Sequence, residues 1–135
     1  MLYMLDTNVC IGIINNKPSQ LRHRLFEIEV GQVGISQIVL YELEYGICSS
    51  QQQERNRRNL TSFLQHIQVF DWQQEQSKEA ALVRCELMEK GNPIGHYDTL
   101  IAAHARSLSA TLVTHNMLEF ERVGGVILED WEVGS

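Results

Sequence analysis

The sequence predicts an α/β fold in which a mostly parallel central sheet is flanked by helices. Apolar runs too short for helices recur along the chain, at residues 2–5, 33–35, 69–70, 111–114 and 126–128, and each is expected to form a strand. Longer segments, with apolar residues three or four positions apart, separate these runs and are expected to be helices. Strands that alternate with helices are typical of a parallel sheet.

Length and composition limit the classes of protein that fit. The chain has 135 residues, of which 44% are hydrophobic, so we expect one domain over residues 1–135 with a single core. No apolar run is long enough to span a membrane and no secretory leader is visible, so a cytoplasmic protein without membrane contact is expected. The net charge of -6 predicts no general affinity for nucleic acid.

The three cysteines do not suggest a metal site. Cys10, Cys48 and Cys85 are far apart and form no Cys-x-x-Cys pair. This spacing argues against a zinc site or a disulfide framework and predicts reduced, mostly buried thiols.

The segments between the first three strands are expected to be helical. Residues 8–15 predict a short helix, and residues 21–28 predict an amphipathic helix that Gly31 ends. The polar and basic stretch 51–58, followed by helically spaced apolar residues over 60–67, predicts a helical hairpin arm whose first turns lie in water. Its arginines fit either a solvated helix face or a nucleic-acid patch.

A helix over residues 37–48, capped by Ser36, places a carboxylate toward the interior. The spacing of Glu42 puts it on one face with three less polar residues. A carboxylate there costs free energy unless it is paired or binds a metal, whereas Glu44 lies off that face and is expected to be solvated. The residues sharing the face with Glu42 are Ile38, Tyr45 and Gly46.

The second half of the chain predicts two more helices. One covers residues 77–90 and ends at the turn 91–93. The next follows Gly95 and carries Asp98 on the same face as three apolar residues. The first helix is expected to bury Ala81, Leu82, Cys85 and Met88, and the second Ile101, Ala102 and Ala105.

Four carboxylates and one amide are placed for chemistry. Asp6 ends the first strand, and Asn116 and Glu119 follow the fourth, at the sheet edge where parallel sheets form ligand sites. Each position alone also has a structural interpretation: Asp6 or Thr7 as a helix N-cap, and Asp98 as an anion favoured by the helix dipole. The full set is Asp6, Glu42, Asp98, Asn116 and Glu119.

Taken together, these oxygen ligands predict a site for a divalent cation. Like charges gathered in one crevice raise one another's pKa, and a bound cation removes that repulsion. Oxygen-only ligands select Mg²⁺, and Mn²⁺ suits the same set. The chemistry that uses such a site is in-line displacement at phosphorus by a metal-activated water.

Four motifs follow one another along the chain. They are Leu5-Asp6-Thr7-Asn8, Glu42-Leu43-Glu44-Tyr45-Gly46, Gly95-His96-Tyr97-Asp98 with Ala102, and Thr114-His115-Asn116-Met117-Leu118-Glu119-Phe120. In this order they resemble the PIN-domain ribonucleases, and more narrowly the VapC toxins of bacterial VapBC toxin–antitoxin pairs. The resemblance covers essentially the whole chain. Residues 90–95 and 129–131 further resemble the subgroup that cuts initiator tRNA in its anticodon loop.

The resemblance implies a role for each site residue. Asp6 and Asp98 become the principal Mg²⁺ ligands, and Glu42 completes the acidic trio. Asn116, where many PIN domains have an acid, shares the fourth corner with Glu119. Thr7 and Asn8 are implied to orient Asp6 or the waters on the metal, and Thr114 to line the pocket.

The resemblance also implies partners: an RNA substrate, a VapB-type antitoxin that inserts a cation, a homodimer and larger toxin–antitoxin complexes. Basic residues from two subunits would flank one groove and offset the negative charge. The candidates are Arg55, Arg57, Arg58 and Lys90.

Three aromatic or imidazole side chains near the motifs have two interpretations each. His96 and His104 could be taken for general bases, but the resemblance implies that the attacking group is a water on the metal. Both histidines are therefore expected to be structural or to position substrate. Tyr97 is expected to pack in the protein, with base stacking as the alternative.

Two other functions compete with the nuclease. A phosphatase would use Asp6 as its nucleophile, but the sequence has Asp-x-Asn where such enzymes have Asp-x-Asp. A catalytically silent binding module would show no Mg²⁺-dependent cleavage of RNA.

Overall fold

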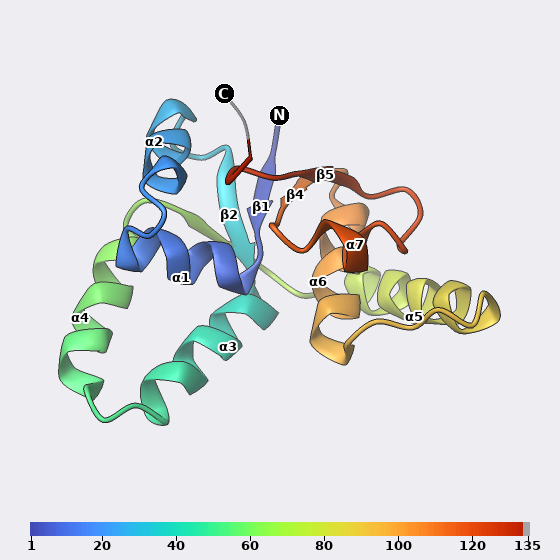
Figure 1. The fold of residues 1–135 in the computed structure, drawn as a ribbon. Helices are drawn as coiled ribbons and strands as arrows, with labels where there is room; N and C mark the ends of the chain where they lie inside the picture. The colour runs from blue at the N-terminus through green and yellow to red at the C-terminus, as the bar shows by residue number, and fades with distance from the viewer. Residues whose placement is uncertain (134–135) are drawn as a thin grey trace.

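A five-stranded sheet forms the centre of the computed structural model, which describes residues 1–133 (Figure 1). Every pair of neighbouring strands is parallel, and the order is β3-β2-β1-β4-β5. This confirms the α/β prediction with its parallel sheet. The strands are β1 Tyr3–Leu5, β2 Val33–Ser36, β3 Gln68–Phe70, β4 Thr111–Val113 and β5 Ile127–Glu129.

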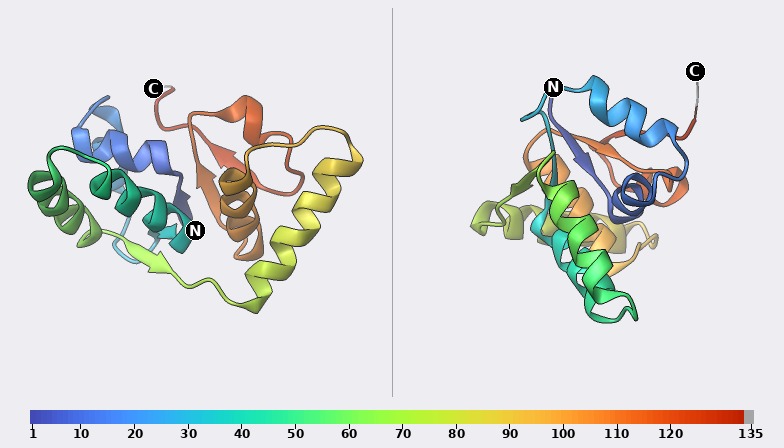
Figure 2. Two further views of the ribbon diagram at one scale, coloured as in Figure 1. Left: turned by 90° about the horizontal axis from the view of Figure 1, so that it is seen from below. Right: turned by 90° about the vertical axis from the view of Figure 1, so that its left-hand side faces the viewer.

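Seven helices surround this sheet in the described part of the chain. Helices α1 to α4 pack together on one side, and α5 packs against α6 on the other (Figures 1 and 2). Helix α3 contacts α6 as well, so the two groups meet beside the central strands. The helices are α1 Thr7–Asn15, α2 Gln20–Glu27, α3 Gln37–Cys48, α4 Gln53–Leu64, α5 Gln74–Glu89, α6 His96–Ser107 and α7 Met117–Phe120.

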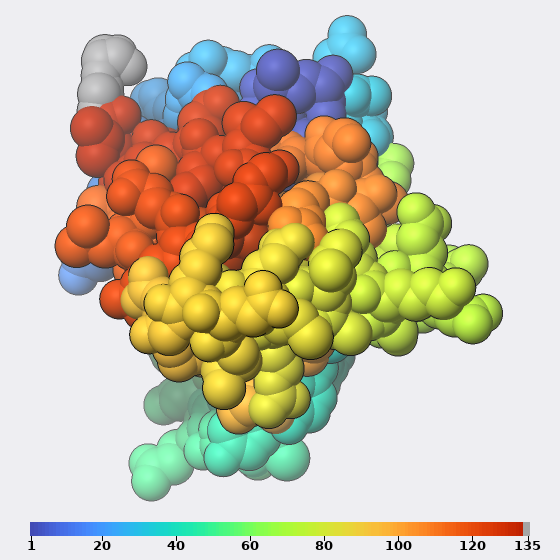
Figure 3. Space-filling model, turned by 90° about the vertical axis from the view of Figure 1, so that its right-hand side faces the viewer, coloured from blue at the N-terminus to red at the C-terminus, as the bar shows by residue number. Residues whose placement is uncertain are grey.

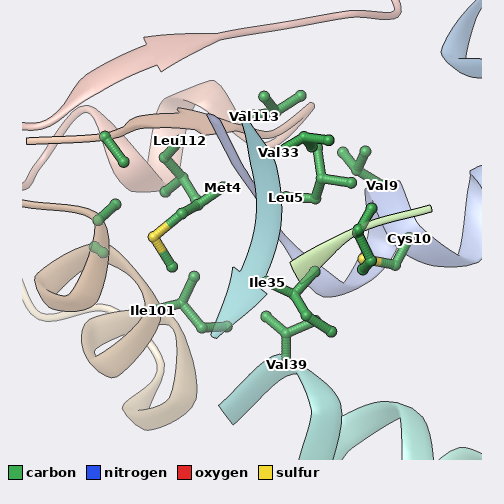
Figure 4. Packing of buried hydrophobic residues seen from close by; sticks show 14 of the residues in the cluster. Met4, Leu5, Val9, Cys10, Val33, Ile35, Val39, Ile101, Leu112 and Val113 are labelled. Atoms are coloured by element: carbon green, nitrogen blue, oxygen red, sulfur yellow. The ribbon is translucent and has the colours of Figure 1, made fainter. Parts of the chain in front are cut away.

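The core has two layers because adjacent residues of a strand point to opposite faces. Met4 extends toward Leu112 and Ile101 on one face of β1, whereas Leu5 faces Val9 of α1 on the other (Figure 4). Met4 and Leu5 are both fully buried. The apolar run before Asp6 therefore anchors the first strand from both sides and fixes where it ends.

Helices α3 and α4 form the expected hairpin arm (Figure 2). Leu60 and Phe63 of α4 are buried, while the first turns of α4 are exposed. Glu44, expected to be solvated, is only partly so: it accepts two hydrogen bonds from Arg57, at 2.6 and 2.9 Å, which tie the two helices together.

The buried face of α3 is one step around the helix from the predicted one. Val39, Leu43 and Ile47 pack into the core, whereas Tyr45 and Gly46 are exposed. Glu42 is half-buried at the border between the two faces. A carboxylate at a border reaches both protein partners and solvent, so the expected inward position of Glu42 is met only in part.

The predicted face of α5 was also wrong. Ala81, Leu82, Cys85 and Met88 are exposed, and the helix packs instead through Ala80, Val83 and Leu87. Both sets have helical spacing, so periodicity alone did not separate them. Figure 3 shows α5 (yellow-green to yellow) running along the surface beneath the C-terminal third of the chain.

Two smaller expectations also differ. Cys10 is buried, but Cys48 and Cys85 are exposed, so most of the thiols are not in the core. Helix α2 ends at Glu27, before Gly31, because Ile28 is already extended. Among residues 1–133, no helix is long and apolar enough to cross a membrane.

Candidate active site

Asp6 follows the last residue of β1 and contacts both β4 and α1. Its backbone N–H donates to the carbonyl of Val113 at 3.1 Å, which continues the β1–β4 ladder. Its side chain caps α1, because Oδ1 accepts the N–H of Val9 at 2.9 Å. Burial raises the pKa of Asp6, and hydrogen bonds from Thr114 and the Val9 N–H oppose that rise. The capping interpretation is therefore correct, and it coexists with a place beside other acids.

Glu42 lies in the middle of α3 and contacts Thr7, the residue that follows Asp6. Ser36 caps this helix by accepting the N–H of Ile38 at 3.0 Å. Thr7 Oγ1 then donates a hydrogen bond of 2.6 Å to Glu42 Oε1. The charge of Glu42 contributes to the raised pKa of both Asp6 and Asp98.

Asp98 lies in the first turn of α6 and is half-buried. Its pKa is raised to about 7, first by burial, then by its hydrogen bond and repulsion with Glu119, and further by the charges of Glu42 and Asp6. These four carboxylates therefore interact electrostatically. Without a metal, the Asp98–Glu119 pair therefore holds a proton below neutral pH and loses it as the pH rises through about 7.

Glu119, in α7, accepts hydrogen bonds on both of its oxygens. The N–H of Gly95 donates to Oε1 at 3.2 Å, and Asn116 Nδ2 donates to Oε2 at 2.5 Å. Burial would raise the pKa of Glu119, but hydrogen bonds from Asp98, the Gly95 N–H and Asn116 outweigh burial and lower it. Asn116 itself is held by its N–H, which donates to Thr114 Oγ1 at 2.9 Å.

The donor chemistry of this acidic crevice fits a hard divalent cation. Its side chains offer only oxygen, apart from the Asn116 amide, and two of the acids are disfavoured as anions while no cation is bound. Within residues 1–133, however, no three acidic, histidine or cysteine side chains lie close enough together to form a metal site. The charges of Glu119, Glu42 and Asp6 all act on Asp98, and a bound cation would have to draw these acids closer together.

The other predicted residues divide into those near the acids and those apart from them. Thr114 is fully buried beside Asp6. Thr7 donates its hydrogen bond to Glu42 and not to Asp6, which was one of its two expected partners. Asn8 and His96 are exposed.

His104 is fully buried, with Nδ1 2.8 Å from Ser36 Oγ, and lies among packed aromatic rings.

Sequence reasoning missed two pairs next to these acids. Tyr97 is exposed rather than packed inside the protein, and its ring faces that of Tyr41. His115 Nδ1 lies 2.9 Å from Asp130 Oδ2, and this hydrogen bond raises the pKa of His115. Tyr41 and Tyr97 each precede a predicted site acid by one position, which is a signal that the sequence does contain.

Comparison with known proteins finds relatives along nearly the whole chain. A family model described as "PIN domain" matches residues 3–126. The chain is 44% identical over 129 residues to the tRNA(fMet)-specific endonuclease VapC of Shigella flexneri, covering 96% of this chain and 97% of that protein. It is 41% identical over 133 residues to ribonuclease VapC2 of Rickettsia felis, covering 98% and 99%.

A solved structure is similar over the same length. A chain of the DNA-bound VapBC from Salmonella typhimurium matches with a TM-score of 0.91 at 42% identity, covering 97% of this chain and 99% of that chain. The chain therefore belongs to the PIN-domain family, within its VapC branch.

Proposed function

We propose that this chain is the toxin of a type II toxin–antitoxin pair: a Mg²⁺-dependent endoribonuclease that cuts initiator tRNA in its anticodon loop and so inhibits translation. The observation that carries the proposal is the acidic crevice at the carboxyl ends of β1 and β4, in a chain 44% identical to a tRNA(fMet)-specific endonuclease. Since tRNA is a cytoplasmic molecule, the proposal places the protein in the cytoplasm.

Asp6, Glu42 and Asp98 are the residues proposed to hold Mg²⁺, and Mn²⁺ suits the same oxygens. Asn116 and Glu119 complete the crevice opposite them. When bound, the cation supplies Lewis-acid activation for hydrolysis at phosphorus. Thr7 keeps Glu42 oriented. Glu119 bonds with protonated Asp98, and a cation held by Asp98 would displace that proton.

The acidic chain by itself offers little positive charge to an RNA, and its negative charge favours a cationic antitoxin. The net charge is -6, and Arg57 is occupied by Glu44, so the single chain offers little positive surface for RNA. We propose that a homodimer supplies the remaining cations, with Arg55, Arg58 and Lys90 exposed for this role.

The antitoxin, of VapB type, is proposed to block the crevice with a cationic side chain and to join the toxin in larger complexes.

The test is cleavage of defined RNAs by the purified, antitoxin-free protein. Initiator tRNA, elongator methionine tRNA and total RNA are each incubated with Mg²⁺ and with a chelator, and the product ends are sequenced. Mg²⁺-dependent cuts confined to the anticodon loop of initiator tRNA are expected, with a 5′-phosphate and a 3′-hydroxyl. Cleavage of other RNAs instead would reject the substrate but keep the ribonuclease, and no cleavage at all would favour a silent binding module.

The product ends separate two mechanisms. Attack by water on phosphorus gives the ends stated above, whereas attack by the ribose 2′-hydroxyl gives a cyclic phosphate. Cyclic phosphate products would reject a hydrolytic site built on these carboxylates.

A further inference from the structure

Two exposed tyrosines lie side by side, and each is next in sequence to one of the site acids. Tyr41 is on α3 and Tyr97 is on α6, and their side chains meet where these helices contact each other. The ring centroids are 5.6 Å apart with an angle of 51° between the ring planes, and the hydroxyl oxygens are 3.4 Å apart. Tyr41 is 53% exposed and Tyr97 is 46% exposed, so neither ring is a core residue.

The pair is tied to the acids by its position in the sequence. Tyr41 immediately precedes Glu42, and Tyr97 immediately precedes Asp98. The tyrosines therefore lie on the same turns of α3 and α6 as these two acids. Tyrosine is enriched at binding surfaces because its ring is apolar while its hydroxyl can stay in contact with water.

We propose that Tyr41 and Tyr97 form a stacking platform for an unpaired RNA base next to the scissile phosphodiester. The inference rests on the proposed ribonuclease function and adds a substrate-positioning site to it. A phosphodiester that a cation at Asp6 and Asp98 would bind has a nucleoside on each side, and every base offers an aromatic face whatever its identity. Neutral phenol rings accept that face without adding charge beside an already acidic crevice.

The platform selects the shape of the substrate rather than its sequence. Bases inside a duplex are already stacked on their neighbours, whereas the bases of a loop are free to leave the stack. A two-ring platform beside the carboxylates therefore favours cleavage in loops and single-stranded segments. A second copy of the protein seated on the tyrosines would be a different function for the same surface, and the experiment distinguishes the two.

The first measurement is steady-state cleavage of an anticodon stem-loop RNA by Tyr41→Ala, Tyr97→Ala and Tyr97→Phe. Loss of a stacked base is expected to raise KM by roughly tenfold to a hundredfold in each alanine variant and to leave kcat nearly unchanged. Tyr97→Phe keeps the ring but loses the hydroxyl, so its KM should stay near that of the wild type. Phe26→Ala is the control, because Phe26 is a 66% exposed ring on α2, away from the acids.

The second measurement is independent of catalysis. The same stem-loop carrying 2-aminopurine in the loop is titrated with protein in chelator, and fluorescence quenching reports stacking. The wild type, Tyr97→Phe and Phe26→Ala should quench, whereas both alanine variants should not. Thermal unfolding of each variant checks that it is folded, and light scattering gives its oligomeric state.

The outcomes keep this inference apart from the proposed function. Unchanged KM and quenching in both alanine variants would overturn the platform while leaving the ribonuclease intact. If the wild type cleaves no RNA, the ribonuclease proposal fails, and quenching that depends on the two tyrosines still supports the platform. Alanine variants that dissociate an oligomer without changing KM would show a protein contact and overturn it.

Discussion

The hydroxyl of Thr7 donates a 2.6 Å hydrogen bond to Glu42, a residue thirty-five positions later in the chain. Thr7 opens α1 directly after Asp6, and Glu42 lies in the middle of α3. The bond therefore holds Glu42 against the segment that carries Asp6. Hydrogen bonds to an ionised carboxylate are stronger than those between neutral groups, so this contact has a defined energetic role.

Thr7→Val tests that role, because valine keeps the branched shape of threonine and removes only the donor. We expect kcat/KM for RNA cleavage to fall about tenfold, which corresponds to the loss of one hydrogen bond to a charged group. Thr7→Ser keeps the hydroxyl and should retain most of the activity. Wild-type activity in Thr7→Val would show that Glu42 does not depend on this bond.

Asp6 has a capping role and a proposed ligand role, and substitution separates them. Asp6→Asn keeps an oxygen for the Val9 N–H, so stability in chelator should be unchanged or higher by about 0.5–2 kcal/mol as repulsion is relieved, while cleavage is lost. Asp6→Ala should lose both cleavage and about 0.5–2 kcal/mol of stability, because the cap is gone. Urea unfolding and RNA cleavage measure the two effects.

The result that would contradict this assignment is simple to recognise. If Asp6→Asn cleaves RNA like the wild type, Asp6 is a cap only. If it loses activity because it is unfolded in chelator, the site assignment loses this support.

Glu42 and Glu44 form a matched pair on one helix. Glu42→Gln keeps the size of the side chain but removes a proposed ligand charge, so we expect a steep loss of cleavage with the protein still folded. Glu44→Gln removes the exposed ion pair with Arg57, and exposed ion pairs contribute little to stability. Its cleavage should stay within about threefold of the wild type, which corresponds to less than 1 kcal/mol. Equal losses in both variants would place the effect in the hairpin rather than in the crevice.

Much of the fold could be predicted because its strands are short apolar runs between polar turns. The predicted runs 2–5 and 111–114 both became strands, β1 over Tyr3–Leu5 and β4 over Thr111–Val113. Parallel pairing then brings their carboxyl ends to one edge, which is why Asp6 and Asn116 were expected on the same side of the sheet.

The faces of the helices were harder to predict. Helix α5 has apolar residues on two sides, and only contact with α6 decides that Val83 is buried and Met88 exposed. Periodicity identifies a helix, but which side is covered depends on elements far away in the sequence. The same limit explains why Tyr97 was expected to pack inside the protein.

Individual contacts in the crevice also lay beyond sequence reasoning. That acids gather at one edge follows from topology. The Gly95 N–H donates to Glu119, and Thr7 donates to Glu42 rather than to Asp6. Both contacts depend on side-chain rotamers and on the distances between elements. No spacing rule within one element supplies these distances.

The raised pKa of Asp98 predicts how stability changes with pH when no metal is present. Folding raises this pKa from 3.8 to about 7, mainly through burial and then through Glu119. The folded protein therefore binds a proton that the unfolded chain releases between these values. The stabilisation is fully present below about pH 4 and is lost as pH rises toward about pH 7.

Thermal unfolding in chelator across this pH range measures the effect, with Asp98→Asn as the comparison. The melting temperature of the wild type should fall relative to that of Asp98→Asn as pH rises, because asparagine cannot ionise and stays compatible with its buried position. Mg²⁺ should reverse the loss at neutral pH, since it binds the deprotonated carboxylate, and it should do so only in the wild type. Parallel pH curves for the two proteins in chelator would show that Asp98 ionises in the folded protein as it does in the unfolded chain. That result would contradict a proton shared between Asp98 and Glu119.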